Sequence, residues 1–175
     1  MSDPLRASVP LTGILLLALL PAACGGGGGG GETPAQLPRL ELRDATFAAG
    51  AATVALPVVL SSIDETRPSL LQFELTTDAA ALEFTGEVVP AAGVAAVAAQ
   101  IVAPGRLRVV VGDSTSTTSP AALPDGALLT AVLRRGPSAV AGTPVEVRLE
   151  NDRATDVQDA EAGFDSDPVT ARITP

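Results

Sequence analysis

The 175-residue chain contains no histidine, no tryptophan, no tyrosine and only one cysteine. Without histidine, it offers no imidazole as a general base or metal ligand, and a single cysteine cannot form an internal disulfide. Four phenylalanines are the only aromatic residues. Because planar sugar-binding surfaces depend on stacked tryptophan or tyrosine rings, the composition argues against a cellulose-binding platform.

Positive charge is also scarce. The chain has 11 basic and 20 acidic residues, a net charge of −9, and every basic residue is an arginine. Neutralising phosphates requires a basic face, so we expect no nucleic-acid partner. Hydrophobic residues make up 46% of the chain, which is enough for one core in a chain of single-domain length.

The N-terminal segment has the pattern of an export signal. An apolar run at residues 11–20 is followed by a proline, two alanines and Cys24. The run is shorter than the roughly 20 apolar residues of a membrane-spanning helix, and it fits the apolar part of a secretory signal. We therefore predict a signal peptide at residues 1–23. Its end resembles a bacterial lipoprotein signal, which implies lipid attachment at Cys24, the alternative being ordinary cleavage or an uncleaved anchor.

Seven consecutive glycines, residues 25–31, follow the cysteine. They match a dinucleotide-binding glycine pattern, but they neither follow a strand nor open a helix, so that interpretation fails. Residues 24–36 are predicted to be a lipid-anchored, flexible tether ahead of a folded domain at 37–175. The protein is thus expected in the cell envelope, outside the cytoplasm, and bound to a membrane only through the lipid.

From residue 40 onward, short segments alternate hydrophobic and polar residues, the pattern of half-buried strands. Turn-forming residues separate them, for example at Thr85-Gly86 and Pro104-Gly105. No stretch has helical spacing between the strands, so a parallel α/β sheet is not favoured. The pattern predicts an all-β fold, an antiparallel sandwich or barrel of many short strands.

Two details of this pattern carry their own predictions. Pro57 lies inside a strand pattern and lacks a backbone donor, which predicts an edge strand or a bulge. Residues 94–102 are rich in alanine and fit either a helical turn or one arm of a hairpin. The neighbouring Pro104-Gly105 turn favours the hairpin arm.

The segment LQFELTTDAAALEF, residues 71–84, resembles the signature of the cohesin domain. It has alternating core residues, then a turn that begins with aspartate, then Leu-Glu and a hydrophobic residue. Further segments resemble the other cohesin strands in the same order, so the resemblance spans nearly all of residues 38–175. These segments are residues 51–60, 106–111, 125–133, 143–150 and 168–174.

This resemblance implies a jelly-roll-like antiparallel β-sandwich of about nine strands, related to some carbohydrate-binding modules, and a dockerin module as partner. It places Phe73, Leu75, Leu82 and Phe84 in the core and Asp78 in a turn. In dockerin-binding cohesins, the strand equivalent to residues 70–75 carries Asn- or Asp-type residues at its first outward positions. This chain has Leu70 and Gln72 there.

We predict a partner-binding surface made by one strand and one loop. The strand contributes Leu70, Gln72 and Glu74, which alternate with core residues. The loop at residues 113–120 is rich in hydroxyl groups and contributes Asp113 and Ser114, although its composition also fits a plain solvated loop.

An acidic stretch between the last two strands spans residues 151–167. Calcium binds six to eight oxygen ligands, but the stretch lacks the spacing of a calcium-binding loop. A solvated acidic loop is the favoured interpretation, and we expect no metal in the domain itself. At Arg134-Arg135, the favoured role is to balance nearby carboxylates rather than to bind a partner.

These observations predict a non-catalytic, exported module that holds a protein partner at the cell surface, in a context of polysaccharide degradation. The partner would be a dockerin-bearing or other protein. We expect no cofactor, with calcium entering only through the partner. The alternative is a glycan-binding module that uses a polar groove. An enzyme would have to rely on carboxylates alone, because no nucleophile, base or metal-ligand spacing is visible.

Overall fold

A computed structural model of the chain describes residues 37–61, 67–112, 121–155, 165 and 169–175. Pro34–Pro175 form one compact unit. Within the described ranges there are ten strands and no helix, hence none suited to crossing a membrane. The strands are β1 (Arg39–Leu42), β2 (Ala45–Thr46), β3 (Thr53–Ser61), β4 (Leu70–Thr77), β5 (Leu82–Pro90), β6 (Ala96–Ala103), β7 (Arg106–Gly112), β8 (Gly126–Arg135), β9 (Val145–Thr155) and β10 (Val169–Thr174).

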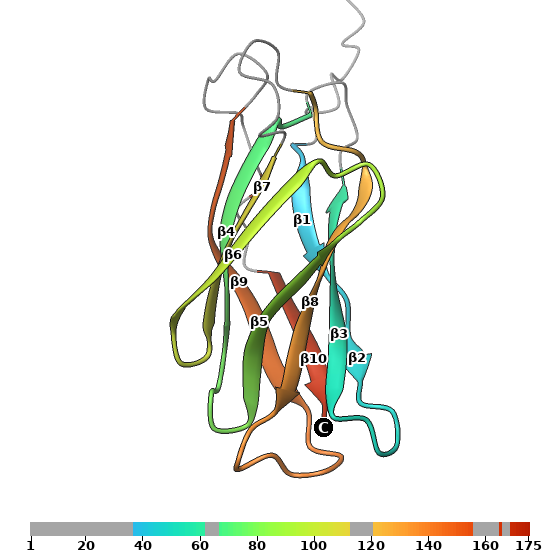
Figure 1. The fold of residues 1–175 in the computed structure, drawn as a ribbon, viewed down its shortest axis with the longest axis vertical. Helices are drawn as coiled ribbons and strands as arrows, with labels where there is room; N and C mark the ends of the chain where they lie inside the picture. Colours follow the sequence, from blue (N-terminus) through green and yellow to red (C-terminus); the bar gives the residue numbers. More distant parts are fainter. Residues whose placement is uncertain (1–36, 62–66, 113–120, 156–164, 166–168) are drawn as a thin grey trace, which may run out of the picture. The chain divides into compact units, whose positions relative to one another are not determined.

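The strands form two sheets packed as a sandwich (Figure 1). The smaller sheet has the order β1-β3-β8-β5 and the larger has the order β2-β10-β9-β4-β7-β6. Neighbouring strands are antiparallel except for β2 and β10, which are parallel. The predicted all-β, antiparallel sandwich is thus confirmed, with ten strands in the described ranges where about nine were expected.

The core lies between the two sheets and follows from the two-residue period of the strands. On β4, Leu71, Phe73 and Leu75 have no exposed surface, and the alternate residues Leu70 and Gln72 are exposed. β7 repeats the pattern with a fully buried leucine and two fully buried valines. Every second residue of these strands therefore faces the smaller sheet, and the others form the outer surface of the larger sheet.

One predicted turn is wrong. Thr85-Gly86 does not separate two strands, because β5 runs through both residues to Pro90. The pairing of β5 with β8 shifts register between Phe84 and Val88, and Gly86 has a φ of 82°. The glycine thus supplies the positive φ of a bulge inside the strand, a role that the sequence does not distinguish from a turn.

The structure shows a bulge beside Pro57 and a hairpin arm within residues 94–102, as predicted. β3 lies between β1 and β8, but β1 pairs only with residues 58–61 of β3, so Pro57 has a strand partner on the β8 side alone. The register shift with β8 lies next to it, between Val58 and Val59. The alanine-rich stretch forms β6, one arm of the hairpin with β7.

Candidate partner-binding face

The outer surface of the larger sheet presents an ordered set of side chains, which we call the β4 face. Residues that pair directly across neighbouring strands lie on the same face of the sheet. The strand register therefore shows which residues lie in one row across this face. Gln72 lies between Val110 of β7 and Arg153 of β9, and Glu74 lies between Arg108 and Glu150. The rows continue onto β6 at Ala98 and Gln100. The β4 face consists of Leu70, Gln72, Glu74, Ala98, Gln100, Arg106, Arg108, Val110, Glu150 and Arg153.

Glu74 is the centre of a hydrogen-bonded cluster on this face. Its Oε1 accepts hydrogen bonds from Nε and Nη2 of Arg108 at 2.9 and 2.7 Å. Its Oε2 lies 3.1 Å from Nε of Arg106 and accepts a hydrogen bond from Nδ2 of Asn151 at 3.2 Å. The Glu74 side chain is only 6% exposed, whereas those of Arg106 and Arg108 are 44% and 49% exposed. The carboxylate is thus covered, and the guanidinium groups are held at the surface.

The register explains why two arginines are needed. Glu74 pairs with Arg108 on one side but directly with Glu150 on the other, and like charges opposite each other destabilise a sheet. Arg106 lies between the two carboxylates, with Nη2 at 3.7 Å from Oε2 of Glu150. Arg106 therefore relieves the repulsion that the strand register creates.

A bulge in β9 brings Asn151 into the cluster. Arg153 pairs with Gln72 and Glu150 pairs with Glu74, so Asn151 and Asp152 together oppose Phe73 alone. Asn151 has a φ of 55° and is the only non-glycine residue with positive φ in the described ranges. Asparagine tolerates this conformation better than most residues. The extra residue turns the Asn151 amide toward Glu74.

A hollow of about 630 Å³ lies beside the cluster, lined by Gln72, Glu74, Arg108, Asn151, Asp152 and Arg153. Asp152 is half-buried, and this burial raises the pKa of its carboxyl, with a smaller contribution from the charge of Asp165. The pKa of Glu74 is shifted the other way. Hydrogen bonding from Arg108 lowers it against the opposing effect of burial, with further lowering by Asn151 and Arg106.

The predicted site residues have different positions in the structure. Leu70 and Gln72 are exposed on the β4 face, and Leu70 packs over Gly112, where a Cβ would lie 2.7 Å from Leu70 Cδ1. Glu74 has the predicted outward register, but its carboxylate is occupied by the cluster. Asp113, Ser114 and Cys24 lie outside the described residues, so their assigned roles stay predictions.

The sequence prediction missed Arg106, Arg108 and Asn151. The one available signal was the alternation Arg106-Leu107-Arg108, which puts two arginines on the same face of one strand. Their partner Glu74 is more than 30 residues earlier, and this pairing depends on the sheet order.

The two arginines at the end of β8, Arg134 and Arg135, have different roles, and only one of them balances a carboxylate as predicted. Arg134 pairs with Glu83, with Nη2 at 2.6 Å from Oε2, as expected for an arginine that balances a carboxylate. Arg135 instead lies over the Phe47 ring, 4.3 Å from its centroid, and donates a hydrogen bond to the Ala51 carbonyl at 2.7 Å. Arg135 thus covers an aromatic ring at the border of the core.

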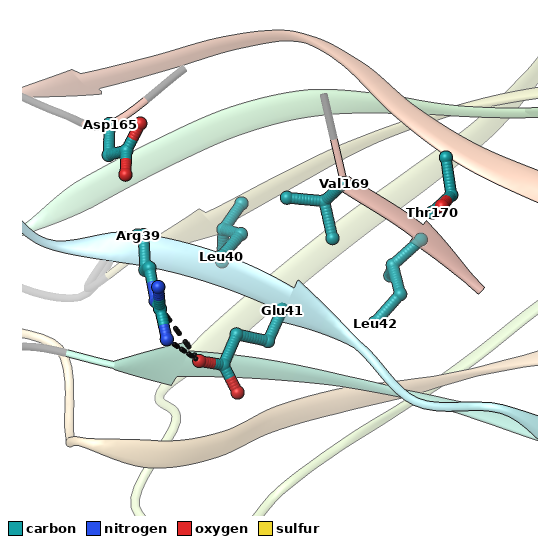
Figure 2. A pocket seen from close by; sticks show the side chains of 7 residues that line it. All are labelled: Arg39, Leu40, Glu41, Leu42, Asp165, Val169 and Thr170. Carbon is teal, nitrogen blue, oxygen red and sulfur yellow. Dashed lines mark hydrogen bonds and ion pairs between the residues drawn. The ribbon is translucent and has the colours of Figure 1, made fainter. Parts of the chain in front are cut away.

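A second hollow, of about 420 Å³, lies where β1 runs beside β10 (Figure 2). The Arg39 guanidinium turns to Glu41 on its own strand, with Nη2 2.7 Å from Oε1, and away from Asp165. Asp165 donates its backbone N–H to the Pro38 carbonyl. No group of three or more carboxylate or thiol side chains suited to a metal occurs in the described ranges. Of the acidic stretch, residues 151 and 152 belong to β9 rather than to a loop, and most of the rest lies outside these ranges.

The Glu74 cluster should make stability depend on pH in the acid range. Because the folded protein lowers the pKa of Glu74 below its ordinary value of about 4.5, the ionised carboxylate stabilises the fold above that pH, and this contribution is lost as pH falls through the folded-state pKa. We expect the urea midpoint, followed by far-UV circular dichroism, to fall below about pH 4.5 more steeply in the wild type than in Glu74→Gln. Equal slopes for the wild type and Glu74→Gln would contradict this account.

The fold and the β4 face together define a class: a two-sheet antiparallel sandwich that presents one broad, polar sheet face. No protein-family model matches the sequence, and no curated protein matches it. Solved structures do. The sixth cohesin of scaffoldin B from Acetivibrio cellulolyticus, in complex with a mutant Cel5 dockerin, is 20% identical with a TM-score of 0.66, over 79% of this chain and 99% of that chain.

Two more cohesin structures match at similar levels. CaCohA2 from Clostridium acetobutylicum is 19% identical with a TM-score of 0.63, over 79% of this chain and 90% of that chain. A non-cellulosomal cohesin from the archaeon Archaeoglobus fulgidus is 15% identical with a TM-score of 0.59, over 80% of this chain and 93% of that chain. The domain therefore has the cohesin fold, as the resemblance implied.

Proposed function

We propose that the domain is a non-catalytic module that binds a protein partner through the β4 face. The observation that carries this proposal is the Glu74 cluster, which holds two arginines, each about half exposed, in fixed positions on an open sheet face. Arginine is enriched among the residues that contribute most to protein interfaces. A guanidinium group already held by a carboxylate loses less side-chain freedom on binding than a free one.

The arrangement also indicates the chemistry of the partner. Each arginine has five N–H donors in a planar fork, more than Glu74 accepts from it, and the side chains of Arg106 and Arg108 are 44% and 49% exposed. Gln72 and Arg153 add further polar groups beside them. A partner surface with carboxylates or backbone carbonyls would complement this row.

The fold supports a partner of the dockerin type. Several of the matching structures are cohesin–dockerin complexes, among them two from Clostridium thermocellum. With Leu70 and Gln72 at the first outward positions of β4, this chain would recognise a dockerin with an apolar and amide-compatible surface at that end. We propose a dockerin-bearing protein as the partner, with calcium bound on the dockerin.

A pull-down with Pro34–Pro175 as bait, against proteins secreted by the source organism, with and without calcium, tests the proposal. Arg108→Ala should weaken binding of the captured protein about tenfold or more, as for an interface residue that contributes strongly. Arg134→Ala is the matched control, because it also removes an outward arginine paired with a glutamate, but on the smaller sheet. Equal loss in both variants, or no loss in either, would contradict the assignment to the β4 face.

We also propose that the domain is displayed on the cell envelope, in a setting of polysaccharide degradation. This part of the proposal rests on the sequence: the signal at residues 1–23, Cys24 and the glycine tether. Mass spectrometry of the N-terminus of the exported protein tests it, since an unmodified mature N-terminus would contradict lipid attachment.

A further inference from the structure

The two sheets end in four edge strands, and three of them carry features that block further pairing. β1 is four residues long, contains Arg39 and Glu41, and bridges to Asp165. β2 has two residues. β5 contains two glutamates, a bulge at Gly86 and a terminal proline. Charges, proline, bulges and short length are the usual means by which proteins protect sheet edges.

The fourth edge, β6, has only one of these features, a register shift against β7 between Ile101 and Ala103, next to the turn. Its eight residues, AVAAQIVA, include no charge, proline or glycine. In the described ranges it pairs only with β7, so its other side has no strand partner. Residues 100–103 are all exposed, regardless of the face to which they point. Residues 96–101 of β6, which pair with β7 without interruption, therefore form an uncharged, largely apolar strand edge of ordinary strand length that is open to pairing.

The inner side of this edge is also accessible. Ile101 pairs with the fully buried Leu107 and so has inward register, yet its side chain is 47% exposed. A hollow of about 280 Å³ separates it from Phe84 and Arg134 of the smaller sheet. In Figure 1, β5 and β6 diverge from the turn that connects them. A strand added beside β6 could thus bury apolar surface as well as form backbone hydrogen bonds.

We propose that two copies of the chain pair through β6, edge to edge and antiparallel, so that the larger sheet continues from one copy into the other. A second copy fits because the strand is self-complementary. In a chain of net charge −9, most surfaces would bring like charges together, but two β6 strands bring none. Paired about Gln100, each side-chain amide can donate to and accept from its counterpart. Ala99 then faces Ile101 of the other copy.

This pairing has a consequence for binding. The two-fold axis of an antiparallel edge pair is perpendicular to the sheet, so both copies present the same face on the same side. The two β4 faces would form one continuous surface on which two partner sites lie side by side. Linked sites of this kind raise the apparent affinity for a multivalent partner without any new contact.

Sedimentation equilibrium of Pro34–Pro175 over a wide concentration range tests the pairing. The wild type should approach twice the monomer mass, and Gln100→Glu should remain a monomer. The new carboxylate faces Arg108 within its own chain, which preserves the fold, but faces a second carboxylate across the pair. Val140→Glu, at a 61% exposed position outside the strands, adds the same charge and should pair like the wild type. A monomeric wild type, or a Gln100→Glu variant that pairs equally well, would overturn the proposal.

Disulfide trapping tests the geometry independently. Cys24 is the only cysteine of the chain and is absent from Pro34–Pro175, so a single introduced cysteine can link only two copies. Directly paired residues have Cα atoms about 4.5–5.5 Å apart, within the range that a disulfide spans. Gln100→Cys should form a covalent dimer rapidly under mild oxidation, and Val140→Cys should not. Equal rates for the two variants would overturn pairing through β6.

Discussion

Replacing Phe73 with alanine is expected to lower the free energy of unfolding by about 3–5 kcal/mol, the usual cost of removing a buried phenylalanine. Phe73 lies at the middle of β4, has no exposed surface, and faces the smaller sheet. The bulge in β9 places Asn151 and Asp152 opposite Phe73, and Asn151 is held by its hydrogen bond to Glu74. The β9 backbone therefore has little freedom to move into the cavity that the alanine would leave. The total free energy of unfolding of a domain of this size is about 5–15 kcal/mol, so this substitution would remove a large part of it.

Urea unfolding followed by far-UV circular dichroism measures this effect, because the chain has no tryptophan or tyrosine to report by fluorescence. Phe73→Leu is the matched control. It keeps most of the volume and should cost less than about 1.5 kcal/mol. Similar losses for the alanine and leucine variants would show that cavity formation is not the cause.

The second large effect is expected at the β6–β7 turn. Gly105 has a φ of 70°, and a Cβ there would clash with the carbonyl oxygen of Thr77. The same region is fixed by a 2.9 Å hydrogen bond from the Thr77 N–H to the Gly105 carbonyl. Gly105→Ala lowers the free energy of unfolding in two ways. A residue with a side chain in the left-handed conformation costs about 1–2 kcal/mol, and overpacking against the Thr77 carbonyl costs about 1–3 kcal/mol. We expect a total loss of about 2–5 kcal/mol.

Gly50 separates these two contributions. It has a φ of 74°, but a Cβ there would meet nothing within 4 Å. Gly50→Ala should therefore cost only the backbone contribution, about 1–2 kcal/mol, in the same urea experiment. If both variants lost the same stability, contact with the Thr77 carbonyl would not matter and the turn would have room to move.

The strands could be predicted from the sequence because their information is local. Alternation along residues 71–75 distinguishes buried Phe73 from exposed Gln72 without reference to any other strand, and Pro104-Gly105 marks the turn after β6. The cohesin-like order of such segments then predicted the sandwich. Local patterns did not distinguish the bulge at Gly86 from a turn, since both use a glycine with positive φ.

The site was harder to predict because it depends on which strands lie together. Glu74 has the outward register that the alternation predicts, but Arg108 and Asn151 reach it from β7 and β9 and cover its carboxylate, so its side chain is buried. No local pattern indicates that β4 lies between those two strands. The same holds for Arg135, whose contact with Phe47 joins positions 88 residues apart by number.

The parallel pair β2 and β10 affects how the chain can fold as it is made. β10 lies between β9 and β2 and contains Ala171 and the fully buried Ile173. The carbonyls of Thr174 and Pro175 accept hydrogen bonds from the N–H groups of Phe47 and Gly142. A nascent chain synthesised only as far as residue 155 would have nine of its ten strands, yet nothing would join β9 to β2. The larger sheet can therefore be completed only after residues 169–174, which form β10, have been synthesised.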